Sequence, residues 1–198
     1  MASRIRFTRA KQVFETFPDL VETVAEPETD IAPAEYSKAL LGSDDPQNAL
    51  TYFAHVLPKR EAVWWGIQCV SGLVENLSEA DKKILALSET WVREGDEEAR
   101  TAVHDAAQEG KMDTASAWVG LAAGWSGGSL SPNPDYRVDT PDDLTAKALN
   151  AGLQIAIGSL GPNDRDEALK SCLAAGLSFA EGGTMPVVTV KSRTQALT

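Results

Sequence analysis

The strongest constraint on the fold is the segment 57–77, which begins Leu-Pro-Lys-Arg-Glu-Ala-Val-Trp-Trp. Pro58 suits the first turn of a helix, where its missing N–H is not needed. On a helical wheel the apolar residues of this segment cover roughly 200° of arc; they are Ala62, Val63, Trp65, Ile67, Cys69, Val70, Leu73, Val74 and Leu77. A helix this apolar is predicted to be contacted on more than one side and to be central.

The polar side of the same helix carries Trp64 beside Gln68. Either another element covers Trp64, or it is an exposed anchor for a partner, because Trp is enriched at binding hot spots. In the first turn, Lys59, Arg60 and Glu61 either form local solvated ion pairs or bond to the ends of neighbouring helices and organise the bundle. These five residues are our candidate partner-binding residues.

The rest of the chain predicts consecutive helices joined by short connections. Pro46 and Pro141 each follow a residue that can cap a helix start, and Ser78 with Asp81 forms a variant of the capping box. Gly95 predicts a left-handed helix stop. Asp96 and Asp113 are further predicted N-caps. We therefore predict an all-α fold, a compact single-domain bundle of about eight or nine antiparallel helices.

We divide the chain into an N-terminal arm with short helices (1–32), a helical domain (33–181) and a C-terminal tail (182–198). The tail either adds a short extended segment or is disordered. Small residues recur every four positions in the last two long helices, which indicates that these helices pack closely against each other. The ridges are Ala148, Gly152 and Ala156, and Ala168, Cys172, Gly176 and Ala180.

Composition narrows the class of protein. The 198 residues include 18 basic and 29 acidic side chains, a net charge of −11, which disfavours nucleic acid and anionic membranes as partners. The chain shows no apolar signal region at its N-terminus and no apolar run long enough to span a bilayer. The two cysteines lie in apolar helical patterns, as in cytosolic proteins. We expect a cytoplasmic protein.

The sequence shows no catalytic signature, cofactor loop or metal-ligand spacing, so we expect no cofactor and no metal site. His55 and Cys69 could form a nucleophile pair, but Cys69 lies within a helix on its apolar face, where burial raises a thiol pKa. His104 shares a face with Arg100 and Glu97, which we expect to be solvated. Residues 126–138 predict a turn-rich loop.

The motif LPKREAVWW (Leu57–Trp65) resembles the hallmark of an uncharacterised bacterial family of small all-helical proteins linked to type VI secretion gene clusters. The resemblance covers about 14 residues, and it brings no established catalytic residues. It implies an accessory role: an adaptor, chaperone or immunity-like protein that binds another protein.

Three hypotheses follow. The first is a non-enzymatic protein-binding accessory protein, supported by the acidic charge and by Trp64. The second is an enzyme whose site assembles from scattered residues near His55 and Cys69, with Arg60 and Glu61. The third is a structural subunit that forms a homo-oligomer through the small-residue ridges or a stripe from Trp118 to Trp125.

Overall fold

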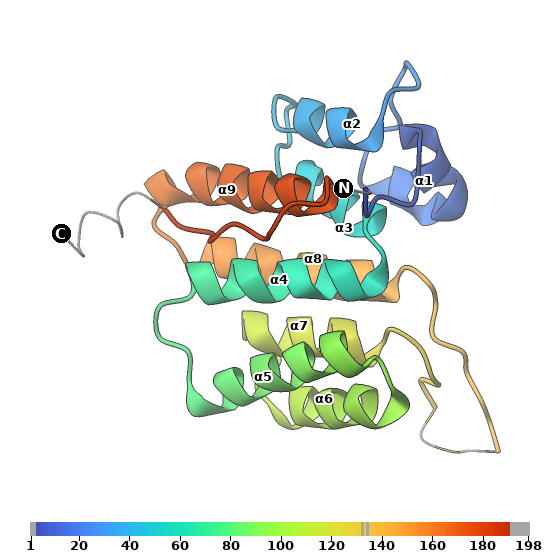
Figure 1. Cartoon of the computed structure of the whole chain (residues 1–198), viewed down its shortest axis with the longest axis vertical. Helices are drawn as coiled ribbons and strands as arrows, with labels where there is room; N and C mark the ends of the chain where they lie inside the picture. The colour runs from blue at the N-terminus through green and yellow to red at the C-terminus, as the bar shows by residue number, and fades with distance from the viewer. Residues whose placement is uncertain (1–2, 132, 134, 191–198) are drawn as a thin grey trace. The chain divides into compact units, whose positions relative to one another are not determined.

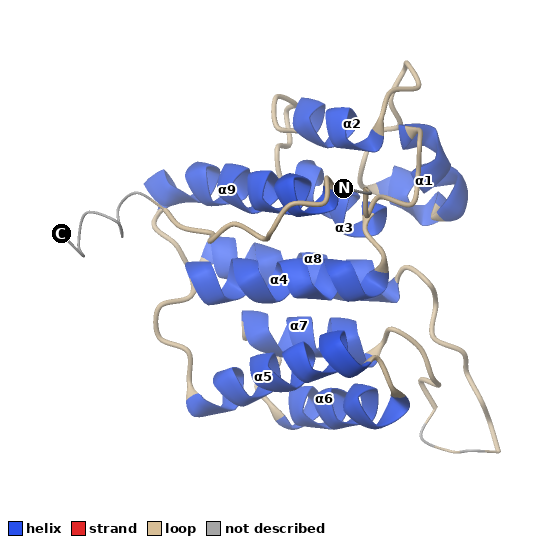
Figure 2. Cartoon of the chain, in the orientation of Figure 1, coloured by secondary structure: helices blue, strands red, loops and turns tan. Residues whose placement is uncertain are grey.

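The computed structural model describes residues 3–131, 133 and 135–190. In that part of the chain the regular structure is helical (Figure 2), apart from one isolated bridge between Ser129 and Asp139. Nine α-helices and one short 3-10 helix follow one another, so the predicted all-α class is confirmed. They are α1 (Ala10–Thr16), η1 (Pro18–Glu22), α2 (Pro33–Leu40), α3 (Asn48–Val56), α4 (Lys59–Leu73), α5 (Glu79–Glu94), α6 (Glu97–Glu109), α7 (Ala115–Gly124), α8 (Leu144–Gly158) and α9 (Pro162–Ala180).

The helices form two compact units. The first combines the described residues before Lys59 with those after Ala156, and therefore contains α1, η1, α2, α3 and α9. The second, from Lys59 to Ala156, contains α4 to α7 and most of α8.

An aromatic cluster joins the N-terminal helices to α3 in the first unit. The rings of Tyr36 and Tyr52 meet edge to face, with centroids 4.9 Å apart, and Phe14 lies against both. The Tyr52 hydroxyl donates to the Ala10 carbonyl over 3.2 Å. Burial raises the pKa of Tyr52, so the phenol remains a hydrogen-bond donor.

Arg4 fixes the described start of the chain to the C-terminal end of α9. Its guanidinium donates to the carbonyls of Phe179 and Gly183 and lies 4.1 Å from the centroid of the Phe179 ring. Beyond α9 the chain turns at Gly182, whose φ is 94°, and residues 183–190 have no regular secondary structure. The side chains of Val188 and Val190 are buried. Their burial favours the alternative in which the tail adds a segment to the fold, up to residue 190, and residues 191–198 lie outside the described part.

Helix α4 begins the second unit. Apart from the partly exposed Trp64, its apolar residues are buried, and within this unit it packs against α5 and α7. The helix ends at Leu73, so Val74 and Leu77 of the predicted apolar face lie beyond it. A side chain at Gly66 would collide with Leu149 of α8, since an added Cβ would lie 2.1 Å from Leu149 Cδ1. The prediction of a helix contacted on several sides is therefore confirmed.

The predicted caps are largely confirmed. Ser78 Oγ accepts from the Asp81 N–H, and Asp81 Oδ2 accepts from the Ser78 N–H. Gly95 is left-handed with φ 72°, and Asp96 caps α6. The cap predicted at Asp113 is wrong by one residue, because the Thr114 hydroxyl accepts from the Ala117 N–H over 3.2 Å.

The small residue at Gly152 serves a different contact from the predicted one. The ridge pattern assigned it to the pairing with the last helix, whereas the structure places it against α7. An added Cβ would lie 3.0 Å from the Ala115 carbonyl oxygen and 3.3 Å from Trp118 Cβ. The pattern indicated a close approach but carried no information about the partner helix.

Gly152 and Gly158 of α8 make a matched pair of test positions. Gly152→Ala is expected to lower the free energy of unfolding by about 1–3 kcal/mol, because the methyl group meets backbone that cannot easily move. Gly158→Ala is expected to be neutral or to stabilise by up to about 1 kcal/mol, since nothing lies within 4 Å of its added Cβ. Urea denaturation measures both, and equal effects would contradict the packing described here.

Candidate functional site

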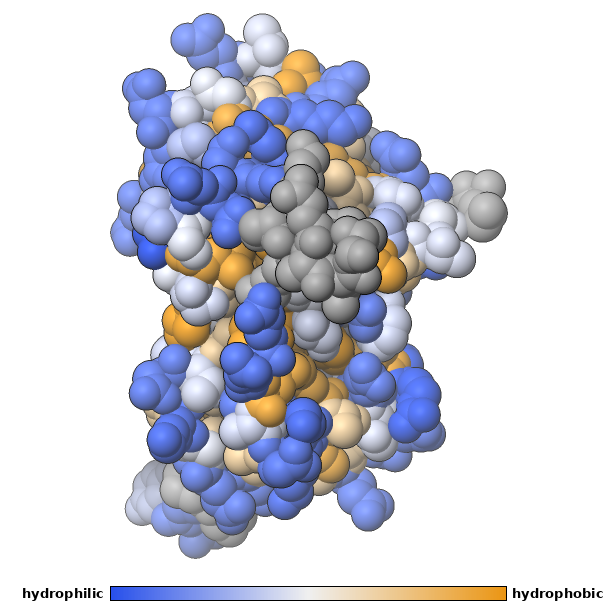
Figure 3. All heavy atoms as spheres, turned by 90° about the vertical axis from the view of Figure 1, so that its left-hand side faces the viewer, coloured by the Kyte–Doolittle hydropathy of each residue, from blue (hydrophilic) through white to orange (hydrophobic). Residues whose placement is uncertain are grey.

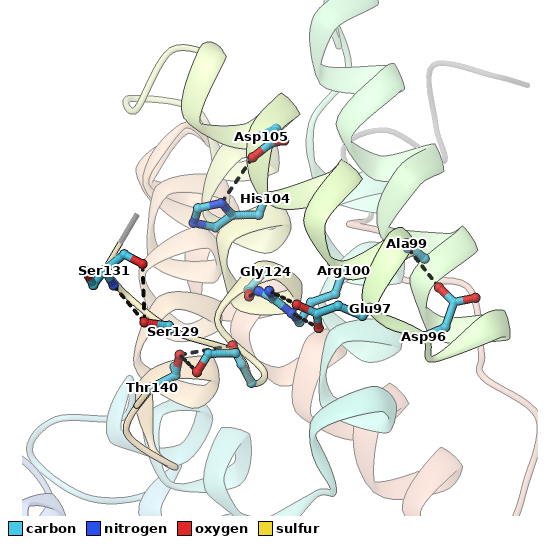
Figure 4. Close-up of polar contacts among 12 residues, drawn as sticks. Asp96, Glu97, Ala99, Arg100, His104, Asp105, Gly124, Ser129, Ser131 and Thr140 are labelled. Carbon is cyan, nitrogen blue, oxygen red and sulfur yellow. Dashed lines mark hydrogen bonds and ion pairs between the residues drawn. The ribbon is translucent and has the colours of Figure 1, made fainter. Parts of the chain in front are cut away.

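The segment between α7 and α8, residues 125–143, extends away from the helices of its unit (Figure 1). We call it the α7–α8 loop. Its base is built around Arg100 of α6 (Figure 4). The Arg100 guanidinium binds both carboxylate oxygens of Glu97, at 2.7 and 2.6 Å, and donates to the carbonyl of Gly124, the last residue of α7.

The same guanidinium supports the first turn of the loop. An added Cβ at Gly128 would lie 2.5 Å from Arg100 Nη2, and the φ of Gly128 is 79°. The left-handed backbone favours glycine at this position, and a side chain here would displace the Arg100 guanidinium. Arg100 therefore holds the end of α7 and the beginning of the loop together.

Further hydrogen bonds close the loop on itself. The Thr140 hydroxyl donates to the Gly127 carbonyl over 3.0 Å, and the Leu130 N–H donates to the Val138 carbonyl over 2.8 Å. Lys59 of α4 donates to the Ser126 carbonyl at 3.0 Å and pairs with Asp142 at 3.2 Å. The two sides of the loop are thus tied to each other and to α4.

The loop presents large apolar side chains to solvent. Leu130, Tyr136 and Val138 are 42%, 72% and 53% exposed. Among the described residues, the other exposed large apolar side chains are Val21, Met112 and Val187, which are dispersed along the chain. Three such exposed groups on one loop make it a candidate contact surface.

Two of the five candidate residues of α4 bind other parts of this chain. Lys59 holds the α7–α8 loop, as described above. Arg60 donates to the carbonyls of Val92 and Arg93, at 2.9 and 2.8 Å, and its guanidinium lies against Gly95 just past α5. For Arg60 the structure therefore supports the alternative in which it bonds to the end of a neighbouring helix.

The other three candidates, Glu61, Trp64 and Gln68, are partly exposed. The side chain of Trp64 is therefore neither fully buried nor fully exposed to solvent. Their role as partner contacts stays a prediction.

His55 and Cys69, the predicted nucleophile pair, are both buried, His55 in the first unit and Cys69 in the second. His55 Nδ1 lies 2.8 Å from the Thr51 carbonyl oxygen, and its ring packs edge-on against Phe17. These contacts give His55 a role in packing α3 against the N-terminal helices.

The expectation of a solvated face at His104, Arg100 and Glu97 holds only in part, because Glu97 is exposed whereas His104 and Arg100 are partly buried. An added Cβ at Gly124 would lie 2.7 Å from His104 Cβ, so this face of α6 packs closely against the end of α7 (Figure 4). The helical wheel grouped the polar residues correctly. The wheel could not show that Gly124, on another helix, leaves room for His104 to pack in a partly buried contact.

The Trp118–Trp125 stripe also packs within its own unit. The two rings meet edge to face with centroids 6.4 Å apart, and they lie against a core of Ile84, Ala107 and Leu121. Trp118 Nε1 donates to the Met112 carbonyl over 2.8 Å. Both indoles keep some exposed surface.

Residues 36–180 match a family of unknown function, DUF6931, over more than half of the chain. The chain belongs to this family. Comparisons with curated proteins and with solved structures give no match. The region that matches DUF6931 includes α4 and the whole α7–α8 loop, so the contacts that support the loop lie within the family region.

Among the described residues of this DUF6931 chain, no helix combines the length and apolar character needed to cross a membrane. The same residues contain no cluster of three or more His, Cys, Asp or Glu side chains suited to a metal ion.

Sequence reasoning missed Leu130, Tyr136 and Val138. It identified the loop from its Gly, Ser, Pro and Asn residues but assigned nothing to the apolar residues within it. One signal was available in the sequence: these apolar residues lie among polar ones in a predicted loop, where no predicted helix could bury them.

Replacing Arg60 tests its role as a helix cap. Arg60→Met removes the donors to the last carbonyls of α5 and is expected to lower the free energy of unfolding by about 1 kcal/mol. The control, Arg93→Met, removes an exposed side chain that bonds within its own helix and should cost less. If the two variants unfold at the same denaturant concentration, Arg60 does not cap α5.

Glu97 makes the loop base sensitive to acid. Hydrogen bonds from Arg100 lower the pKa of Glu97. A lowered folded-state pKa means that this pairing stabilises the fold above the ordinary glutamate pKa, and that the contribution is lost as the pH falls through the lowered value. The melting temperature of Glu97→Gln should therefore lie below that of wild type at neutral pH and converge with it in acid. Glu94→Gln is the control, and a constant difference at every pH would contradict this assignment.

Proposed function

We propose that this chain is a non-enzymatic, protein-binding accessory protein that contacts its partner through the α7–α8 loop. The observation that carries the proposal is the exposure of Leu130, Tyr136 and Val138 on one internally bonded loop. Tyrosine is enriched among residues that dominate binding energy, and Tyr136 is the most exposed of the three.

The anchoring of the loop favours binding because less conformational entropy is lost when the partner docks. Arg100 holds the first turn, Thr140 closes the base, and Lys59 contacts both ends. In this proposal Lys59 and Arg60 position the scaffold and do not themselves contact the partner. Glu61, Trp64 and Gln68 stay predicted contacts on α4.

The charges around the apolar residues indicate the chemistry of the partner. Asp135, Asp139 and Asp142 are exposed, and Arg137 is paired with Asp139 at 2.6 Å. The whole chain carries a net charge of −11. A partner surface with an apolar centre and a basic rim would complement this loop in both respects.

The adaptor, chaperone or immunity-like role and the type VI secretion setting belong to this proposal. They rest on the resemblance of the Leu57–Trp65 motif, and membership of DUF6931 is compatible with them. The enzyme and homo-oligomer hypotheses gain no specific support from the contacts of His55, Cys69, Trp118 and Trp125.

Affinity capture from the native host tests the proposal. Tyr136→Ala should lower the affinity for a captured partner by at least about tenfold, as expected for a central aromatic contact. The melting temperature should not change, because the ring is exposed. Val187→Ala, at another exposed apolar residue, should leave capture unchanged.

Trp64→Ala separates the two candidate surfaces. Loss of the partner with Trp64→Ala and its retention with Tyr136→Ala would move the contact from the loop to α4. Identical capture by all the variants would refute both surfaces.

A further inference from the structure

The two sides of the α7–α8 loop pair with each other over a short stretch of backbone. Ser129 and Asp139 form an antiparallel bridge, and the Leu130 N–H donates to the Val138 carbonyl over 2.8 Å. The Val138 N–H in turn donates to the Ser129 hydroxyl oxygen over 3.1 Å. Both backbone groups of Val138 therefore point toward the opposite side of the loop.

This pairing directs two neighbouring backbone groups outward. The peptide bonds of the described residues are trans, and in a planar trans unit the carbonyl and the N–H point in opposite directions. The Arg137 carbonyl shares a peptide unit with the Val138 N–H, and the Asp139 N–H shares one with the Val138 carbonyl. An outward acceptor and an outward donor therefore lie on either side of Val138.

The outward groups form an open hydrogen-bonding edge. Within the part of the chain that the structure describes, neither the Arg137 carbonyl nor the Asp139 N–H has a hydrogen-bond partner. Residues 135–139 are all exposed, so another chain can reach both groups. Unpaired backbone groups at such an edge are a template for a further strand.

The side chains beside this edge indicate the chemistry of the added strand. Val138 lies between the two outward groups and is exposed, as is Tyr136 two residues earlier. The Arg137 guanidinium is already paired with the Asp139 carboxylate at 2.6 Å. The Asp135 carboxylate has no ion pair among the described residues. An apolar side chain beside Val138 and a basic one beside Asp135 would complement this edge.

We propose that an extended segment of the partner protein adds as a β-strand to residues 137–139 of the α7–α8 loop. Its backbone donates to the Arg137 carbonyl and accepts from the Asp139 N–H. Its side chains alternate between apolar ones, toward Val138, and polar ones, which include a lysine or arginine near Asp135. This inference rests on the function proposed for the loop, and it adds that the partner is recognised through its main chain.

The test selects peptides on the full chain from a displayed random library, with peptides of about eight residues, longer than a typical strand. We expect basic sequences in which apolar and polar residues alternate. Each peptide residue is then N-methylated in turn, and affinity is measured by fluorescence polarisation. Strand pairing predicts a loss of at least about tenfold at alternate positions only, because successive N–H groups of a strand point to opposite sides.

Asp139→Pro removes the outward donor from the chain itself. Asp139→Ala is the matched control, because both variants lose the carboxylate and only one loses the N–H. Proline is tolerated at an edge position whose N–H faces solvent. Asp139→Pro should bind a selected peptide about tenfold more weakly than Asp139→Ala does. Hydrogen exchange at the Leu130 amide shows whether each variant keeps the pairing inside the loop, and where that pairing is lost the N-methyl scan decides.

Tyr136→Ala separates this inference from the function proposed for the loop. Weaker binding by Tyr136→Ala, with equal affinities for the two Asp139 variants and no alternation in the N-methyl scan, would overturn strand pairing and leave the loop as the contact surface. Equal binding by wild type, Tyr136→Ala and Asp139→Pro would overturn both.

Two further outcomes would overturn the strand proposal alone. One is the selection of no peptide whose affinity depends on the Asp139 N–H. The other is a peptide-free dimer, detected by sedimentation, that Asp139→Pro dissociates and Asp139→Ala does not. In that case the edge pairs with a second copy of this chain and not with a different protein.

Discussion

The last carbonyls of an α-helix have no partners inside that helix, and in this chain arginines supply donors to several of them. Arg4 binds the end of α9, Arg60 the end of α5, Arg100 the end of α7, and Arg165 the end of α8. A guanidinium suits this position because it offers several donors in one plane and remains charged at neutral pH. Its charge also complements the negative end of the helix dipole. Each contact specifies where a helix stops and which element lies beside its end.

The same device connects the scaffold to the candidate site. Arg100 contacts the last residue of α7 and the first turn of the loop, and Lys59, at the start of α4, contacts both ends of the loop. The motif that begins α4 therefore has a structural role on two sides, through Arg60 at α5 and Lys59 at the loop. Because the loop is held at its base, its apolar side chains need not be buried for the loop to keep its conformation.

The fold was predictable where the signal was local. The start of α5 at Ser78, its stop at Gly95 and the apolar circumference of α4 each depend on residues close together in sequence. The contacts of Arg60, Arg100 and Gly152 depend on residues about 30 positions away, or on which helix packs against which, and no periodicity encodes this. The same limit explains why His104 and Arg100 are less exposed than expected. The loop residues were missed because the periodicity of apolar residues indicates which side chains a helix can bury. The candidate site consists instead of apolar side chains that remain exposed.

Net charge explains how such a chain can expose apolar side chains. On the face drawn in Figure 3, hydrophilic residues cover most of the surface and apolar residues show in smaller areas between them. With 29 acidic against 18 basic residues, the net charge opposes the approach of two copies over a range of about 8 Å at physiological salt. A basic partner experiences the opposite force. The same charge that discourages self-association therefore favours a different, complementary surface.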